Sequence, residues 1–125
     1  MSIAEINQLN WVDSFLSDIS IKSNNIQMRI ITEGSVTYKL SFLEYIAFEY
    51  IGHWDESIIE SIQADLQGEL IEKALVEVKK NYSDTEIPFC EKHLNDPWIQ
   101  TNIKIIDGGI AKIVCKDIFV EVTRE

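Results

Sequence analysis

The sequence predicts an α+β domain, with a curved, mainly antiparallel sheet of about six to seven strands and one main helix packed on one face. Three observations carry this prediction. Apolar and polar residues alternate along several short segments, and one longer segment has the 3.6-residue spacing of a helix. The third observation is their order, because strands precede the helix and a C-terminal β-hairpin follows it.

The first part of the chain contains the alternating segments. Residues 1–9 are expected to form a short helical or irregular lead-in. Three strands are then predicted, over residues 11–21, 26–30 and 36–42. Asn24-Asn25 is a turn signal, so the first two of these strands should form a hairpin.

Residues 45–66 carry two further strand predictions. Aromatic and branched side chains crowd into residues 45–51, which is typical of a strand with both faces largely covered. Residues 57–66 fit both a strand and a helical stripe, and we favour a strand that ends near Gly68.

The main helix is predicted over residues 69–82, where Glu69 and Glu72 lie in the first turn and Lys79-Lys80 in the last, as the helix dipole favours. Residues 83–97 contain both prolines and predict a long loop. Alternation on both sides of Asp107-Gly108-Gly109 then predicts the hairpin. Because no linker or repeat divides the sequence, residues 1–125 are expected to form a single domain.

Composition restricts the class of protein. With 46% hydrophobic residues, the 125-residue chain can bury a core without metal or disulfides. The start of the chain lacks the features of a secretory signal, and no apolar run is long enough to span a bilayer, so we expect a cytoplasmic protein that is not in the membrane. Cys90 and Cys115 are therefore expected to be free thiols.

The acidic charge is concentrated in one segment. The net charge is −10, from 21 acidic and 11 basic residues, and this argues against binding to nucleic acid or anionic membranes. Residues 40–72 contain no Lys or Arg but eight acids: Glu44, Glu49, Asp55, Glu56, Glu60, Asp65, Glu69 and Glu72. This acidic segment is either a solvated face or a docking surface for a basic partner.

The best candidate for a binding site lies inside the acidic segment, where an imidazole, an indole and two carboxylates follow Gly52. Such residues suit hydrogen bonding and apolar anchoring of a partner. The predicted partner-binding residues are Glu44, Glu49, His53, Trp54, Asp55, Glu56 and Glu60. The alternative is structural: Trp54 covers a sheet edge, and Asp55 or Glu56 caps a turn.

Other candidate sites are weaker. Cys90 and His93 could meet at one metal or one nucleophilic dyad, but no further ligands have matching spacing. Trp11 and Trp98 are expected to pack on the sheet. Phosphate-binding glycine motifs are absent from the sequence. We therefore predict no catalytic residue, no metal and no cofactor, and the question of enzymatic activity stays open.

Four short stretches carry a resemblance to known proteins: Trp11 to Ser14, residues 48–57, Asp96 to Gln100, and Ile106 to Gly109. Together they resemble small uncharacterised bacterial domains, some of which are similar to immunity proteins of polymorphic toxin systems. The resemblance implies a bacterial, cytoplasmic, protein-binding domain, and it carries no active-site residues with it.

Three hypotheses of function follow. The first is an interaction protein whose acidic segment docks on a basic partner, such as a toxin with a cationic nuclease surface. The second is a small-molecule-binding protein or enzyme that uses His53 and Trp54 together with the 83–97 loop. The third is a structural module that forms homo-oligomers through a sheet edge.

Overall fold

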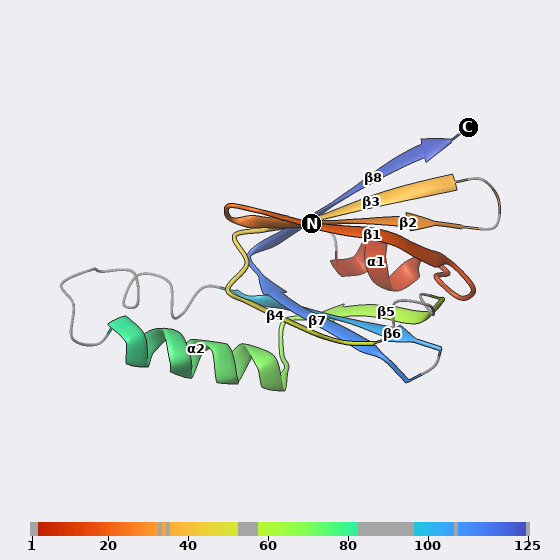
Figure 1. Cartoon of the computed structure of the whole chain (residues 1–125). Helices are drawn as coiled ribbons and strands as arrows, with labels where there is room; N and C mark the ends of the chain where they lie inside the picture. Colours follow the sequence, from red (N-terminus) through yellow and green to blue (C-terminus); the bar gives the residue numbers. More distant parts are fainter. Residues whose placement is uncertain are drawn as a thin grey trace.

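The computed structural model describes residues 3–32, 34, 36–52, 58–82, 97–106 and 108–124. Within these residues there are two helices, α1 (Ile3–Gln8) and α2 (Glu69–Tyr82). The strands are β1 (Phe15–Lys22), β2 (Asn25–Ile31), β3 (Val36–Leu43), β4 (Ala47–Ile51), β5 (Ile59–Asp65), β6 (Ile99–Ile105), β7 (Ile110–Cys115) and β8 (Asp117–Arg124). They form two antiparallel sheets, the first in the order β1-β2-β3-β8 and the second in the order β4-β7-β6-β5 (Figure 1).

The predicted fold class is therefore wrong. The described part of the chain is mostly β, with four strands in each of two sheets, where the sequence predicted one sheet covered by a helix. Alternation shows that a strand buries one face, but it does not show which partner covers that face. The predicted hairpin exists as β6 and β7, but it is not C-terminal, because β8 follows it and returns to pair with β3.

The main core lies between the two sheets. Side chains from β2 and β3, among them Met28 and Phe42, meet side chains from β5 to β7, among them Ile59 and Ile113, and all of these are fully buried. The α2 helix, whose predicted bounds are confirmed, packs on the opposite face of the second sheet (Figure 1). The helix thus covers a small separate cluster, while sheet-on-sheet packing supplies most of the buried apolar surface.

The edges of β1 and β5 are joined along one side of the core. Asp13 N donates to Ile59 O (3.1 Å) and Ile59 N donates to Ser14 O (2.8 Å). The first strand begins only at Phe15, later than predicted, because Asp13 has a positive φ of 64° and breaks the extended chain. These two hydrogen bonds join edge strands of the two sheets, β1 and β5.

The α1 helix seals the same side of the molecule. The Asn7 side chain forms two hydrogen bonds with the backbone of Ala64, at 2.9 and 2.8 Å. Trp11 is buried, donates from Nε1 to Ile6 O (2.8 Å) and contacts the Tyr38 ring edge-on at 5.0 Å between centroids. The prediction that Trp11 packs on the sheet is confirmed.

On the other side of the core, the polypeptide passes directly from one sheet to the other. The β3 strand continues into β4, and β7 continues into β8, so one bent pair of chains belongs to both sheets. At the bend, Lys116 N donates to Leu43 O (3.0 Å) and Ile46 N donates to Val114 O (2.9 Å). Glu44 adopts a positive φ of 53° there. We refer to residues 43–46 and 114–117 as the corner.

Two predictions for the middle of the chain have different outcomes. Within the ambiguous segment 57–66, residues Ile59–Asp65 form a strand, β5, as favoured. The strand predicted over residues 45–51 exists as β4, but the prediction that both its faces are covered is wrong, because Glu49, Tyr50 and Ile51 are exposed, Ile51 at 73%. No helix in the described ranges is long and apolar enough to cross a membrane.

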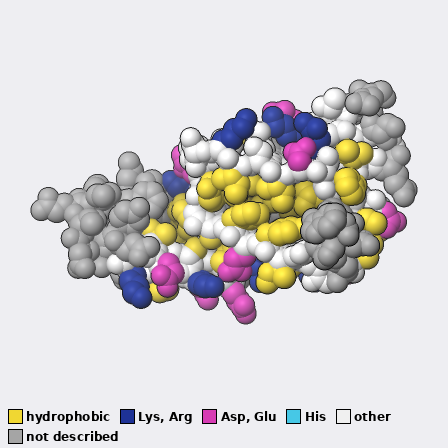
Figure 2. Space-filling model, viewed as in Figure 1, with side chains coloured by type: hydrophobic (Ala, Val, Ile, Leu, Met, Phe, Trp, Pro, Cys, Tyr) yellow, Lys and Arg dark blue, Asp and Glu magenta, His cyan; other side chains and the backbone are white. Residues whose placement is uncertain are grey.

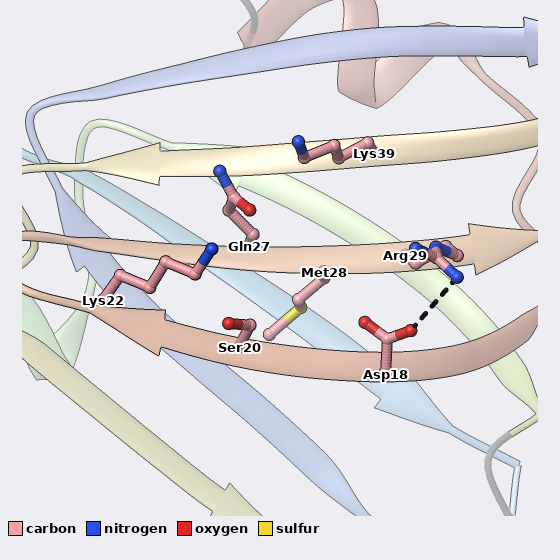
Figure 3. A pocket seen from close by; sticks show the side chains of 7 residues that line it. All are labelled: Asp18, Ser20, Lys22, Gln27, Met28, Arg29 and Lys39. Carbon is pink, nitrogen blue, oxygen red and sulfur yellow. Dashed lines mark ion pairs between the residues drawn. The ribbon is translucent and has the colours of Figure 1, made fainter.

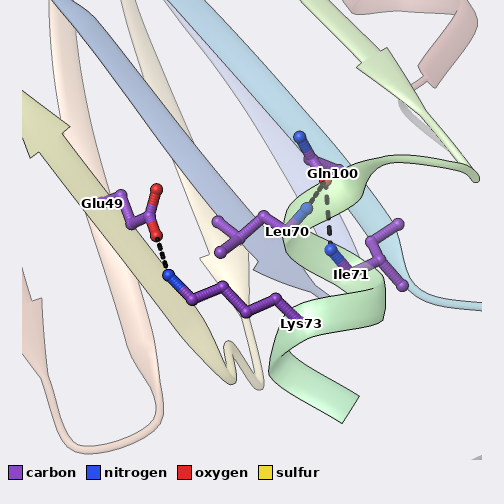
Figure 4. Close-up of polar contacts among 5 residues, drawn as sticks. All are labelled: Glu49, Leu70, Ile71, Lys73 and Gln100. Carbon is purple, nitrogen blue, oxygen red and sulfur yellow. Dashed lines mark hydrogen bonds and ion pairs between the residues drawn. The ribbon is translucent and has the colours of Figure 1, made fainter. Parts of the chain in front are cut away.

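A buried glutamine positions α2 on the second sheet. Gln100, on β6, accepts hydrogen bonds through Oε1 from Leu70 N (3.0 Å) and Ile71 N (3.2 Å), two amides in the first turn of the helix (Figure 4). Its Nε2 donates to Asn102 Oδ1 (2.9 Å). A side chain at Gly68 would collide with the end of the Gln100 side chain, so a larger residue there would displace Gln100 from the helix amides.

Replacing Gln100 should therefore destabilise the protein through the helix. In Gln100→Leu the amides of Leu70 and Ile71 lose their acceptor, and each buried unsatisfied amide costs about 1–3 kcal/mol. We expect a lower free energy of unfolding in urea denaturation. The exposed glutamine Gln63, changed to Leu, is the matched control and should alter stability by less than about 0.5 kcal/mol. Equal effects of the two substitutions would contradict this role of Gln100.

Candidate functional site

The structure describes three of the seven predicted partner-binding residues, Glu44, Glu49 and Glu60. The other four, His53, Trp54, Asp55 and Glu56, lie outside the described residues, and so do Cys90, His93 and most of the predicted 83–97 loop. The site can therefore be assessed at its acidic residues on β4, on β5 and at the corner.

Glu44 is part of the corner. Its carboxylate forms an ion pair with Lys116 (3.4 Å), and the Lys116 ammonium lies 5.6 Å from the centroid of the Trp98 ring. Trp98 is buried with 3% of its surface exposed, so the predicted packing of this residue is also confirmed. The charge of Glu44 is thus balanced by a lysine from outside the acidic segment, and its position supports the bend.

Glu49 is also paired with a lysine. Its carboxylate lies 3.3 Å from Lys73 Nζ on α2 (Figure 4), and Lys112 is its direct neighbour on β7. With Glu69 and Leu70, these residues line a shallow concavity of about 140 Å³. Two acids face two lysines there, so this part of the surface has little net charge.

Glu60 lies at the opposite edge of the second sheet from Glu49. The sheet order places β7 and β6 between β4 and β5. Three strand spacings amount to about 14 Å between the two edge strands. The structure therefore does not bring Glu60 and Glu49 together, although the sequence predicted them as members of one site.

Three other acids of the segment gather where β5 leads into α2. Asp65, Glu69 and Glu72 are exposed, and none of them forms an ion pair with another described residue. Leu66, between them in sequence, is 53% exposed. Along the lower margin of the face in Figure 2, acidic and basic side chains lie next to one another. We call Asp65, Glu69 and Glu72 the acidic junction.

The chemistry of the described residues gives little support for catalysis or metal binding. Among them no group of three His, Cys, Asp or Glu side chains could hold a metal ion. Cys115 is a free thiol, fully buried, and its Sγ donates to Asp117 O (3.4 Å). Burial, and next the negative charge of Asp117, raise the pKa of this thiol from 9.0 to about 12. It is protonated at neutral pH, which makes it a poor nucleophile.

Comparison of the chain with protein-family models, with curated proteins and with solved structures gave no match. Function must therefore be argued from the surfaces themselves.

The raised pKa of Cys115 makes stability fall at alkaline pH. The thiol binds its proton more tightly in the folded state than in the unfolded state. Its contribution to the free energy of unfolding is therefore fully present below pH 9 and is lost as the pH rises towards 12. Between pH 9 and 10.5 the free energy of unfolding should fall by about 2 kcal/mol more in wild type than in Cys115→Ala, which has no thiol at this position. Urea denaturation at both pH values measures this difference, and equal losses in the two proteins would refute it.

Proposed function

We propose that this chain is a protein-binding domain whose acidic segment docks on a basic partner. The observation that supports it is incomplete charge compensation. Of the six acids of the segment that the structure describes, lysines pair only with Glu44 and Glu49. The other four, Glu60 and the three of the acidic junction, have no ion pair within the described residues, although Glu69 lines the same concavity as Lys73 and Lys112.

The acidic junction is the part of the segment that best suits docking. An exposed leucine, Leu66, lies between Asp65 and Glu69 in the sequence, and protein interfaces combine such an apolar side chain with charges that guide the encounter. The helix dipole favours Glu69 and Glu72 at the start of α2, and Asp65 Oδ1 accepts a hydrogen bond from Gln67 N (3.3 Å) at the end of β5. These local roles leave all three carboxylates exposed and without an ion pair to a described residue, as docking on a cationic surface requires.

The resemblance to immunity proteins suggests the kind of partner. A toxin that cleaves nucleic acid carries a cationic surface, and an acidic domain that covers this surface blocks access of the phosphate backbone. The proposed setting is the bacterial cytoplasm. A toxin gene next to the gene for this chain would support the proposal.

The proposal is tested by capture with two immobilised baits from a lysate of the bacterium that encodes the chain. One bait is wild type, and the other carries Asp65→Asn, Glu69→Gln and Glu72→Gln. Wild type should retain a basic protein at low salt and release it as the ionic strength rises above about 0.1 M, where charges are screened beyond about 10 Å. The triple variant should bind the captured protein at least about tenfold more weakly.

A second triple variant, Glu5→Gln, Glu77→Gln and Glu121→Gln, is the matched control, because it removes the same charge from exposed positions outside the acidic segment. Its affinity for the captured protein should stay within about threefold of wild type. The proposal fails if wild type captures no basic protein, or if both triple variants lose the same affinity.

A further inference from the structure

The basic residues of the first part of the chain also converge, on a different surface. Lys22, Arg29 and Lys39 are all the Lys and Arg residues before residue 73. Their strands, β1, β2 and β3, lie side by side in the first sheet. The neighbouring residues Met28 and Leu40 point into the core and are fully buried, so Arg29 and Lys39 point away from it. The three cations therefore share the outer face of the first sheet, which α2 does not cover (Figure 1).

Two of these cations are placed directly against each other. Arg29 and Lys39 are paired in the register of β2 and β3. Like charges at directly opposed positions destabilise a sheet. In a chain of net charge −10, two cations at directly opposed register positions are unexpected, and such local conflicts are typical of functional positions.

Neighbouring acids do not neutralise the face completely. Arg29 forms an ion pair with Asp18 (3.6 Å), its partner in the register of β1 and β2. Lys22 and Lys39 have no ion pair within the described residues, although Glu121 is opposite Lys39 in the register. Two positive charges are therefore left without an ion pair to any described residue.

The geometry brings these two charges to one hollow. A shallow concavity of about 260 Å³ is lined by Asp18, Ser20, Lys22, Gln27, Met28, Arg29 and Lys39. Figure 3 shows the Lys22 and Lys39 side chains extending from either side towards Gln27, while Arg29 turns to Asp18. The half-buried Gln27 amide and Ser20 hydroxyl add hydrogen-bond donors to the same hollow.

We propose that this concavity binds the phosphate group of a small phosphorylated ligand. A phosphate monoester carries about −1.5 to −2 charges at pH 7, which matches the two unpaired lysines. Lysine binds phosphate as a point charge, and the Gln27 and Ser20 donors can bond the remaining oxygens. A nucleic acid is disfavoured, because its many phosphates would approach a chain of net charge −10 that offers only two free cations here.

The test is a titration of the isotope-labelled chain with phenyl phosphate, followed by NMR at constant ionic strength. The amide signals of Ser20 and Gln27 should shift saturably, and benzoate, which carries one charge, should bind more weakly. Lys22→Gln and Lys39→Gln should each weaken binding by roughly threefold, and the double variant by roughly tenfold. Asp18→Asn should tighten binding by roughly threefold, because it frees Arg29.

Lys104→Gln is the matched control, since Lys104 is an exposed lysine on the second sheet. It should leave the affinity unchanged. The tighter binding of Asp18→Asn cannot result from misfolding, so it separates a specific site from general damage. The proposal is overturned if the signals of wild type do not saturate, if Lys104→Gln weakens binding as much as Lys39→Gln, or if Asp18→Asn does not tighten it.

Discussion

The corner is the constraint on which the rest of this structure depends. Because β3 runs into β4 and β7 runs into β8, one bent pair of chains is shared by both sheets, and the hydrogen bond from Lys116 N to Leu43 O holds the bend. The bend folds one sheet over the other, so the apolar faces of both cover each other. The ion pair between Glu44 and Lys116 and the buried Trp98 lie at the same place.

The corner also decides how charge is distributed over the surface. It leaves each sheet with one outer face, and these two faces differ. The outer face of the second sheet is partly covered by α2, which is positioned through Gln100, and its acids alternate with lysines. The outer face of the first sheet lacks such a helix and carries Lys22, Arg29 and Lys39. A strongly acidic protein thus keeps a small cationic surface apart from its acidic junction.

This separation relates the two proposals to each other. The acidic junction and the cationic concavity belong to different sheets, so a protein partner and a phosphorylated ligand could bind without sharing residues. Cys115, by contrast, is a core residue, and its protonated, buried thiol belongs to the packing between the sheets.

The sequence by itself determined the local features: the bounds of α2, the strand nature of β5, the β6-β7 hairpin and the burial of Trp11 and Trp98, since each depends on periodicity or side-chain size. The tertiary structure decided which strands share a sheet, and with it the fold class. It also separated Glu49 from Glu60, brought Lys22, Arg29 and Lys39 to one concavity, and placed Gln100 against two helix amides 29 and 30 residues away in sequence. Periodicity records which face a strand buries, whereas pairing between distant strands depends on contacts that no local pattern contains.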